Sequence, residues 1–282
     1  MSSHEENLSN ADYNRLRKLI SAESGINLSP DKKMMLELRI RRRLRGLNLN
    51  TYSEYCEYLF DGRNHRDEIV QLLDVVTTNK TDFFREPDHF DYLANRAVPD
   101  MVARNASGRP LLVWSAGCSS GEEPYTLAMV LSECLPAGLR FRVLATDIST
   151  TVLTKASRGV FKREVVAPVP EELRQKYFMR SREPGSDLMR VVPELRKLVE
   201  FRRLNFMDAD FGLSDRADAI FCRNVIIYFD RPTQEQILQK LTRQLVPSGY
   251  LFMGHSESLH GMDLALTPVA AALYRKNSDA GT

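Results

Sequence analysis

The stretch WSAGCSSGEEPYTLA, residues 114–128, places small residues and two glutamates between an apolar segment and a helix-like one. Residues 117–121 match G-x-S-x-G, the turn that presents the nucleophilic serine of α/β-hydrolases. Alternatively, the glycine-rich turn could lie against a nucleotide-like cofactor, because glycines let the backbone approach a ligand closely. The residues around the turn help to distinguish nucleophilic catalysis from cofactor binding.

The surroundings of this turn do not suit a hydrolase. The segments before it read as helices, and no HGGG-like segment supplies a second oxyanion donor. Glu122 and Glu123 occupy the first helical turn after the loop. A carboxylate about 5 Å from a developing oxyanion costs ~3 kcal/mol at an effective dielectric constant of about 20, so the hydrolase interpretation is disfavoured.

The same glutamates disfavour a ligand with phosphates, and the G-x-x-x-G spacing differs from the dinucleotide fingerprint. A positively charged nucleoside such as S-adenosylmethionine fits better. Asp147, in ATDIS, ends the next predicted strand, where an acidic side chain can bind both ribose hydroxyls. Helix-dipole and capping preferences alone could also explain each of these acidic residues. Together, in one βαβ unit, they favour cofactor binding.

Composition indicates an ordinary globular protein, with 43% hydrophobic and 27% charged residues among 282. No apolar run reaches the ~20 residues of a membrane span and no signal-peptide pattern is present, so a cytoplasmic protein is expected, with a monomer as the default. Five histidines without metal-ligand spacing predict no metal site. Scattered cysteines without a C-x-x-C pair are expected to be reduced thiols; they are Cys56, Cys118, Cys134 and Cys222.

The chain divides into a helical part and an alternating part. Residues 1–85 read as a helical N-terminal domain, residues 86–110 as a linker with one helix, and residues 111–282 as an α/β domain. Strands alternating with helices predict a mostly parallel sheet covered on both faces. Residues 178–204 interrupt the alternation and predict a small inserted antiparallel β-subdomain. The strand-like runs are residues 111–116, 141–146, 217–222 and 250–255.

A basic segment lies in the helical part: residues 29–50 carry seven basic side chains against two acidic ones. Positions 32, 39 and 43 fall nearly on one line of a helix, away from the apolar stripe at 36, 40 and 44. A solvated face is a common explanation. The excess of one sign favours contact with an acidic partner, and it predicts that Arg39 and Arg43 are exposed to solvent.

Three further motifs, NKTDFFR (79–85), CRNVIIYF (222–229) and GHSES (254–258), join WSAGCSSGEEPYT and ATDIS in the same order along the chain. Together they resemble the bacterial chemotaxis-receptor methyltransferases (CheR type), which methylate receptor glutamates with S-adenosylmethionine. The resemblance implies a Rossmann-like methyltransferase domain, an all-α N-terminal domain and an inserted β-subdomain. In some members that subdomain binds a C-terminal receptor peptide through glycines in its turn. Here Gly185 is the only glycine in the turn, so tethering is left open.

The resemblance also implies a set of site residues. The expected cofactor contacts are Asn79, Thr81, Arg85, Gly117, Glu122, Asp147, Asn205, Phe206, Arg223 and Asn224. The expected catalytic side chains are Arg85 and Tyr228. The expected residues that dock the receptor, a glutamate-rich helical coiled coil, are Lys32, Arg39, Arg42 and Arg43.

Methylation of a glutamate explains why no catalytic triad is evident. A carboxylate is already an anionic nucleophile at neutral pH, so it needs positioning rather than a general base. Arg85 is expected to anchor a carboxylate and Tyr228 to orient the acceptor, with core packing as the alternative for Tyr228. His255, Ser256 and Glu257 are adjacent, so their side chains point to different faces and are expected to support the site indirectly.

Two other functions stay open at this point. A basic helix also suits nucleic acid, as in an RNA or DNA methyltransferase. The segment CRNVIIYFD lacks the proline-aromatic stacking signature common in enzymes that methylate bases, which disfavours this alternative. A non-catalytic S-adenosylmethionine sensor would bind the cofactor tightly without turnover.

Overall fold

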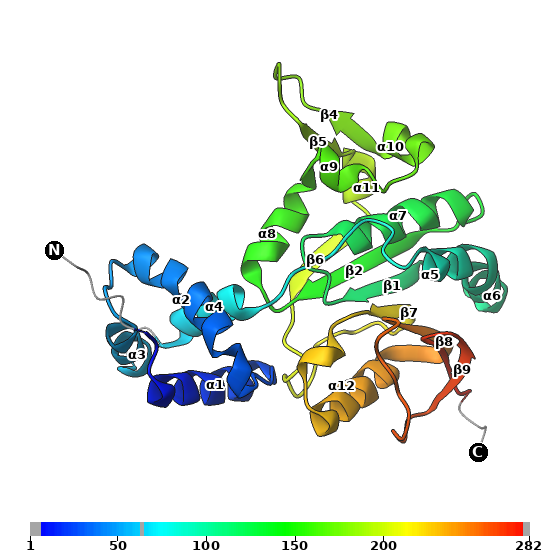
Figure 1. Cartoon of the computed structure of the whole chain (residues 1–282). Coiled ribbons are helices and arrows are strands. Elements are labelled where there is room, and N and C mark those ends of the chain that lie inside the picture. Colours follow the sequence, from blue (N-terminus) through cyan, green and yellow to red (C-terminus); the bar gives the residue numbers. More distant parts are fainter. Residues whose placement is uncertain (1–6, 63–64, 279–282) are drawn as a thin grey trace.

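The computed structural model describes residues 7–62 and 65–278, and its first part is a group of short helices (Figure 1). Their apolar stripes pack into one core that includes Leu16, Leu36 and Leu72. Thr51 and Glu54 form a reciprocal capping box that fixes the start of α3. The elements are α1 (Asn10–Ser24), η1 (Pro30–Lys32), α2 (Lys33–Leu47), α3 (Tyr52–Phe60) and α4 (His65–Val76).

Residues 77–86, called the linker from here on, join these helices to a helical segment that packs on the sheet and lies within residues 86–110. Phe83 of the linker is buried against Phe161 and Phe178, with ring centroids 5.0 and 5.6 Å away. These edge-to-face contacts fix the conformation of the linker, whose residues line the site described below. The elements that follow are α5 (Pro87–Tyr92), the π-helical η2 (Leu93–Ala97) and α6 (Val98–Arg104).

Among the described residues, seven strands form one sheet in the order β6-β2-β1-β7-β8-β10-β9. The first five are parallel, and β10 and β9 complete one edge in antiparallel orientation. Separate apolar clusters cover the two faces, so the predicted mostly parallel, doubly covered sheet is confirmed. The strands are β1 (Leu111–Ala116), β2 (Phe141–Asp147), β6 (Val199–Arg203), β7 (Ala217–Cys222), β8 (Leu245–Met253), β9 (Leu266–Ala270) and β10 (Leu273–Lys276).

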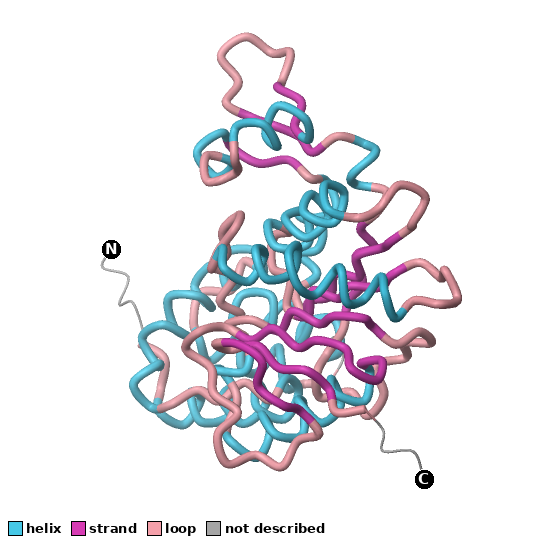
Figure 2. Tube along the Cα trace, turned by 90° about the vertical axis from the view of Figure 1, so that its right-hand side faces the viewer, coloured by secondary structure: helices cyan, strands magenta, loops and turns pink. Residues whose placement is uncertain are grey.

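Helices lie on both sides of this sheet, and a small subdomain projects from it, sharing the apolar cluster of one face (Figure 2). The covering elements that matter for the site are α7 (Glu122–Cys134), α8 (Thr150–Arg158), η3 (Ile226–Tyr228) and α12 (Arg231–Gln244). The subdomain has a three-stranded antiparallel sheet in the order β3-β5-β4. Its elements are β3 (Val160–Lys162), α9 (Arg163–Val166), α10 (Glu171–Tyr177), β4 (Phe178–Arg180), β5 (Leu188–Val191) and α11 (Pro193–Arg196).

The strand content of the insert differs from the sequence prediction at both ends. Val199–Arg203, assigned to the insert, is β6 and pairs in parallel with β2 in the large sheet. As an edge strand it is only partly buried, so its pattern resembles that of a hairpin strand rather than a central one. Val160–Lys162, which lies before residue 178, supplies β3 of the small sheet.

The N-terminal helices contact the sheet domain directly. The Asn27 N–H donates to the carbonyl oxygen of Tyr228 at 2.8 Å. The Asn205 amide donates to the carbonyl oxygen of Glu23 at 2.6 Å. These bonds attach the end of α1 and the chain after it to the loops at the carboxyl ends of the strands. Within the described residues, no helix is both long enough and apolar enough to cross a membrane.

The prediction that Arg39 and Arg43 form a solvent-exposed face is wrong. Arg43 makes a bidentate pair with Glu68, with Nε–Oε1 at 2.8 Å and Nη2–Oε2 at 2.6 Å, and Glu68 is only 2% exposed. Arg39 donates to the carbonyls of Val76 and Thr77 at the end of α4. A fourth helix packs on this face of α2, which helical periodicity within α2 alone cannot reveal.

Candidate cofactor pocket

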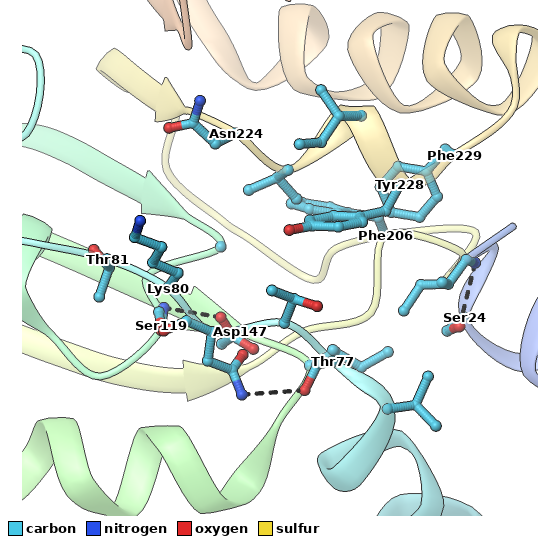
Figure 3. Close-up of a pocket in the computed structure, with 18 of the residues that line it drawn as sticks. Ser24, Thr77, Lys80, Thr81, Ser119, Asp147, Phe206, Asn224, Tyr228 and Phe229 are labelled. Atoms are coloured by element: carbon cyan, nitrogen blue, oxygen red, sulfur yellow. Dashed lines mark hydrogen bonds between the residues drawn. The ribbon is translucent and has the colours of Figure 1, made fainter. Parts of the chain in front are cut away.

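A cavity of about 410 Å³ lies where β1, β2 and β7 end, a size within the usual range for small-molecule sites. Its walls come from the glycine-rich loop, the linker, the chain after β6 and β7, and the N-terminal helices. Figure 3 shows Asp147 and Ser119 on one side of the cavity and aromatic side chains on the other. Ligands of open α/β sheets bind at this end, because the loops there follow the strand ends.

The glycine-rich loop is held tightly at Gly117. The N–H groups of Gly117 and Cys118 both donate to the carbonyl oxygen of Thr146 at 2.8 Å, which ties the loop to β2. Gly117 has a φ of 91°, and a Cβ there would lie 2.5 Å from Cγ2 of Val225. A larger residue would therefore close the cradle between the β1 and β7 loops.

Asp147 ends β2 and lines the cavity with one side of its carboxylate. Its Oδ2 accepts the Ser119 N–H at 2.9 Å, and its Oδ1 accepts the Ser149 N–H, also at 2.9 Å. Burial raises the pKa of this carboxyl, and these backbone donors lower it. Each carboxylate oxygen accepts about two hydrogen bonds, so capacity remains for a diol, in keeping with the predicted ribose contact.

We expect Asp147→Asn to weaken binding of S-adenosylhomocysteine by about 1.5–3 kcal/mol, the scale of hydrogen bonds to a charged group. The amide nitrogen replaces one acceptor oxygen, and the negative charge that strengthens the remaining bonds is lost. Titration calorimetry measures the effect, with circular dichroism as the check on folding. Unchanged affinity would show that Asp147 only orders the Ser119 and Ser149 backbone.

Glu122, in the first turn of α7, was expected to contact the cofactor, but it does not line the cavity. Among the described residues, the glutamate of this turn that lines the cavity is Glu123, whereas Glu122 is buried beside it and accepts the Ser120 hydroxyl at 2.8 Å. Glu123 accepts the Ser115 hydroxyl at 2.7 Å. Burial raises the pKa of both carboxyls. The assignment of Glu122 to the methionyl ammonium stays a prediction, and Glu123 joins the candidates.

Arg223 lines the cavity, and its guanidinium is committed to protein partners. It pairs with Glu123 (Nη1–Oε2 3.2 Å) and Glu86 (Nη2–Oε2 3.0 Å) and donates to the carbonyl of Arg85. The guanidinium lies over the Phe90 ring, with its central carbon 5.4 Å from the ring centroid. Because the side chain is almost fully buried, these partners offset its desolvation. Arg223 thus fixes the linker against β7.

A single carboxylate organises the loop after β7. The Glu257 oxygens accept the backbone N–H groups of Gly254, Asn224, Val225 and Ile226 at 2.7–2.9 Å. Asn224 has a φ of 57°, a conformation that these bonds help to hold. Glu257 thus supports the loop that precedes Tyr228.

Aromatic rings form the opposite wall. Phe206, Tyr228 and Phe229 lie together, and the Tyr228 hydroxyl points into the cavity (Figure 3). The centroids of Phe206 and Phe229 are 6.4 Å apart. Asn205 lines the cavity too, but its amide donates to Glu23, which joins the wall to α1. A flat apolar wall facing an acidic one suits a purine nucleoside.

The linker contributes Asn79, Thr81 and Arg85, which all line the cavity, and their contacts with the cofactor stay a prediction. The Asn79 carbonyl accepts the Ser119 hydroxyl at 2.9 Å, and the Asn79 amide donates to the Thr77 hydroxyl at 3.3 Å. Arg85 donates to the carbonyl of Lys80 at 3.2 Å and is partly exposed. Ser119, the serine of the G-x-S-x-G match, is thus bonded to backbone, which gives the hydrolase interpretation no support.

Part of the wall was not expected from the sequence. The N-terminal helices and their connections contribute Ser24, Ile26, Leu28, Lys32 and Met35. No local signal marks these residues as ligand-facing, because only the packing of α1 and α2 on the loops brings them there. Of the predicted docking residues, Lys32 lies at the cavity. Arg42 is the other one that is exposed.

Comparisons with known proteins match the chain over almost its whole length. The family described as "CheR methyltransferase, all-alpha domain" matches residues 11–77, and "CheR methyltransferase, SAM binding domain" matches residues 79–274. A "Chemotaxis protein methyltransferase" of Escherichia coli K12 is 40% identical over 273 residues, 96% of this chain and 93% of that protein. "Chemotaxis protein methyltransferase 2" of Pseudomonas aeruginosa PAO1 is 39% identical over 264 residues, 93% of this chain and 92% of that protein.

Proposed function

The chain belongs to the CheR family of chemotaxis methyltransferases and uses S-adenosylmethionine, and from this premise we propose that it forms methyl esters on glutamate side chains of chemoreceptors. The observation that favours a carboxylate acceptor is the composition of the pocket. Arg85 and Tyr228 both line it, and a guanidinium and a phenol can each donate hydrogen bonds to a carboxylate. A glutamate acceptor is already anionic at neutral pH and needs no general base.

The residues present fit the cofactor. Gly117 leaves a cradle that a Cβ would fill, Asp147 has free acceptor capacity, and the aromatic wall suits a purine. When bound, S-adenosylmethionine supplies an electrophilic methyl group that an anionic carboxylate can take directly. Asp147 would hold the ribose and Glu123 or Glu122 the ammonium.

Arg85 and Tyr228 are the proposed residues for the acceptor. Arg85 lines the cavity and is partly exposed, so its guanidinium can reach an incoming carboxylate. The Tyr228 hydroxyl faces the cavity from η3 and can donate to one carboxylate oxygen, leaving the other directed at the methyl group (Figure 3).

Incubation with labelled S-adenosylmethionine and membranes containing candidate receptors tests the proposal. Base-labile label released as methanol is expected, because methyl esters hydrolyse in base whereas methylated amines and bases do not. RNA and DNA are offered in parallel. Label on nucleic acid alone would replace the proposal with the nucleic-acid alternative, and tight cofactor binding without label on any acceptor would favour a sensor.

Tyr228→Phe is expected to lower kcat about tenfold while S-adenosylhomocysteine affinity stays within about twofold. The variant removes one hydrogen bond to the acceptor, worth about 1–1.5 kcal/mol, and keeps the ring in the aromatic wall. Single-turnover methylation and calorimetry give the two quantities. If affinity fell in step with the rate, Tyr228 would belong to the cofactor wall instead.

The receptor surface is proposed on the exposed side of α2. Arg42 is exposed there, near Met34 and Leu38, which are 72% and 56% exposed. Lys32 extends this surface to the cavity mouth. A basic and apolar strip of this kind is complementary to an acidic amphipathic helix such as a receptor coiled coil. The proposed partner, the helical domain of the receptors, lies in the cytoplasm, so the encounter is proposed to take place there.

We expect Arg42→Glu to raise the KM for receptor severalfold at low salt without changing cofactor affinity, because attraction to an acidic helix becomes repulsion. Arg140→Glu is the matched control: it makes the same charge change at an exposed position directly before β2, at the end of the sheet opposite the cavity. Added salt should narrow the difference between wild type and Arg42→Glu. Equal effects of the two substitutions would indicate net charge rather than docking.

A further inference from the structure

Three potential metal ligands from two distant parts of the sequence lie close together at the end of the linker. Glu86 ends the linker, His89 lies on α5 and His255 follows β8. One ligand atom from each lies within 4.8 Å of the others. The five histidines have no metal-ligand spacing along the chain, so the sequence alone predicts no metal. Folding brings two of them together regardless of that spacing.

His89 is the unusual member of this cluster. Its side chain is 2% exposed, yet neither ring nitrogen has a hydrogen-bond partner. Nδ1 lies 3.5 Å from Oε2 of Glu86, beyond hydrogen-bond distance. Unpaired polar atoms this deeply buried are rare and costly.

The surroundings of His89 suit a cation. His255 is 44% exposed at its side chain, and its Nε2 lies 3.1 Å from Oδ2 of Asp88. Such a carboxylate–histidine contact orients the ring and raises its basicity at metal sites. Arg223 is the positive group facing Glu86, but Glu123 also pairs with it. With Asp88 included, three carboxylates face one guanidinium, so the local charge remains negative.

We propose that Glu86, His89 and His255 bind one first-row transition-metal dication such as Zn²⁺. Two imidazoles and one carboxylate are a common ligand set for such ions, with water completing the shell. Tetrahedral zinc needs ligand atoms about 3.3 Å apart, given bonds of about 2.0–2.1 Å. The exposed His255 ring can close the remaining gap by a side-chain rotation. Glu86 and His89 are three residues apart at the start of α5, which keeps them adjacent.

The test is calorimetric titration of the full, tag-free chain with Zn²⁺ alone. One ion per chain is expected to bind, and His255→Asn should weaken the affinity at least tenfold. Its matched control is His260→Asn, an exposed histidine five residues further on, which should bind zinc as the wild type does. Absence of saturable binding, or equal affinity in both variants, would overturn the site.

Titration with cobalt(II) provides a second measurement, and it uses the wild-type chain, so its outcome does not depend on whether a substituted chain folds. Binding in a low-symmetry nitrogen and oxygen site should produce visible d–d absorption that zinc displaces at one equivalent. A spectrum unchanged from that of aqueous cobalt would contradict the proposal. Neither measurement involves the methyl donor or an acceptor, so a negative result would leave the proposed methyl-ester formation unaffected.

Discussion

Replacing Arg43 with alanine is expected to lower the free energy of unfolding by about 3–5 kcal/mol, the usual cost of removing one partner from a buried ion pair. Glu68 is 2% exposed and, among the described residues, would keep the Tyr55 hydroxyl, which donates to it at 2.9 Å. The hydrogen bonds and charge of Glu68 raise the pKa of Arg43, in keeping with a strong pair. Chemical denaturation followed by circular dichroism measures the loss.

Arg42→Ala is the control for this experiment, since it removes a neighbouring arginine from the exposed side of the same helix and should change stability by under about 0.5 kcal/mol. Adding Glu68→Gln to Arg43→Ala should recover part of the loss, because the amide carries no buried charge. If Arg43→Ala were as stable as Arg42→Ala, the pair would be no stronger than a surface salt bridge.

Glu257→Gln is expected to lower kcat about 100-fold, the cost that a misplacement of about 1 Å can impose on catalysis. The carboxylate accepts four backbone N–H groups, and an amide in its place has only one acceptor oxygen. Two backbone donors, one buried and one partly buried, would be left without partners, at up to about 1–3 kcal/mol each. The loop carrying Asn224 and Tyr228 would then lose its fixed position.

The exposed neighbour Ser256 supplies the control, because Ser256→Ala removes a hydroxyl from the same turn without touching this network. Single-turnover methylation and thermal unfolding should both separate the two variants. Glu257→Gln with wild-type kcat and melting temperature would mean that the loop holds its conformation by packing alone.

Local patterns in the chain were enough to predict the central strands and the loop chemistry. β1 and β7 are continuous apolar runs buried on both faces, and such runs are readable without knowledge of their neighbours. The same is true of Gly117 and Asp147, because a turn between a strand and a helix constrains its residues locally. Five motifs in a fixed order then indicated the family, which the comparisons confirm.

Residues whose role depends on a distant partner could not be placed this way. The periodicity of α2 separates Leu36 and Ile40 from Arg39 and Arg43, but it cannot show that α4 covers the arginines. Edge strand β6 was assigned to the wrong sheet for a related reason, since its pattern records how much of it is buried and not against what.

The sequence by itself therefore determined the class of fold, the glycine loop and the acidic end of β2, since these depend on residues adjacent along the chain. Only the tertiary structure decided that Glu257 holds the Tyr228 loop, that Arg223 is committed to Glu86 and Glu123, and that the N-terminal helices complete the pocket. The physical reason is that hydrogen bonds and ion pairs act over a few ångströms in space. Partners separated by up to 182 residues leave no periodic signal in either segment.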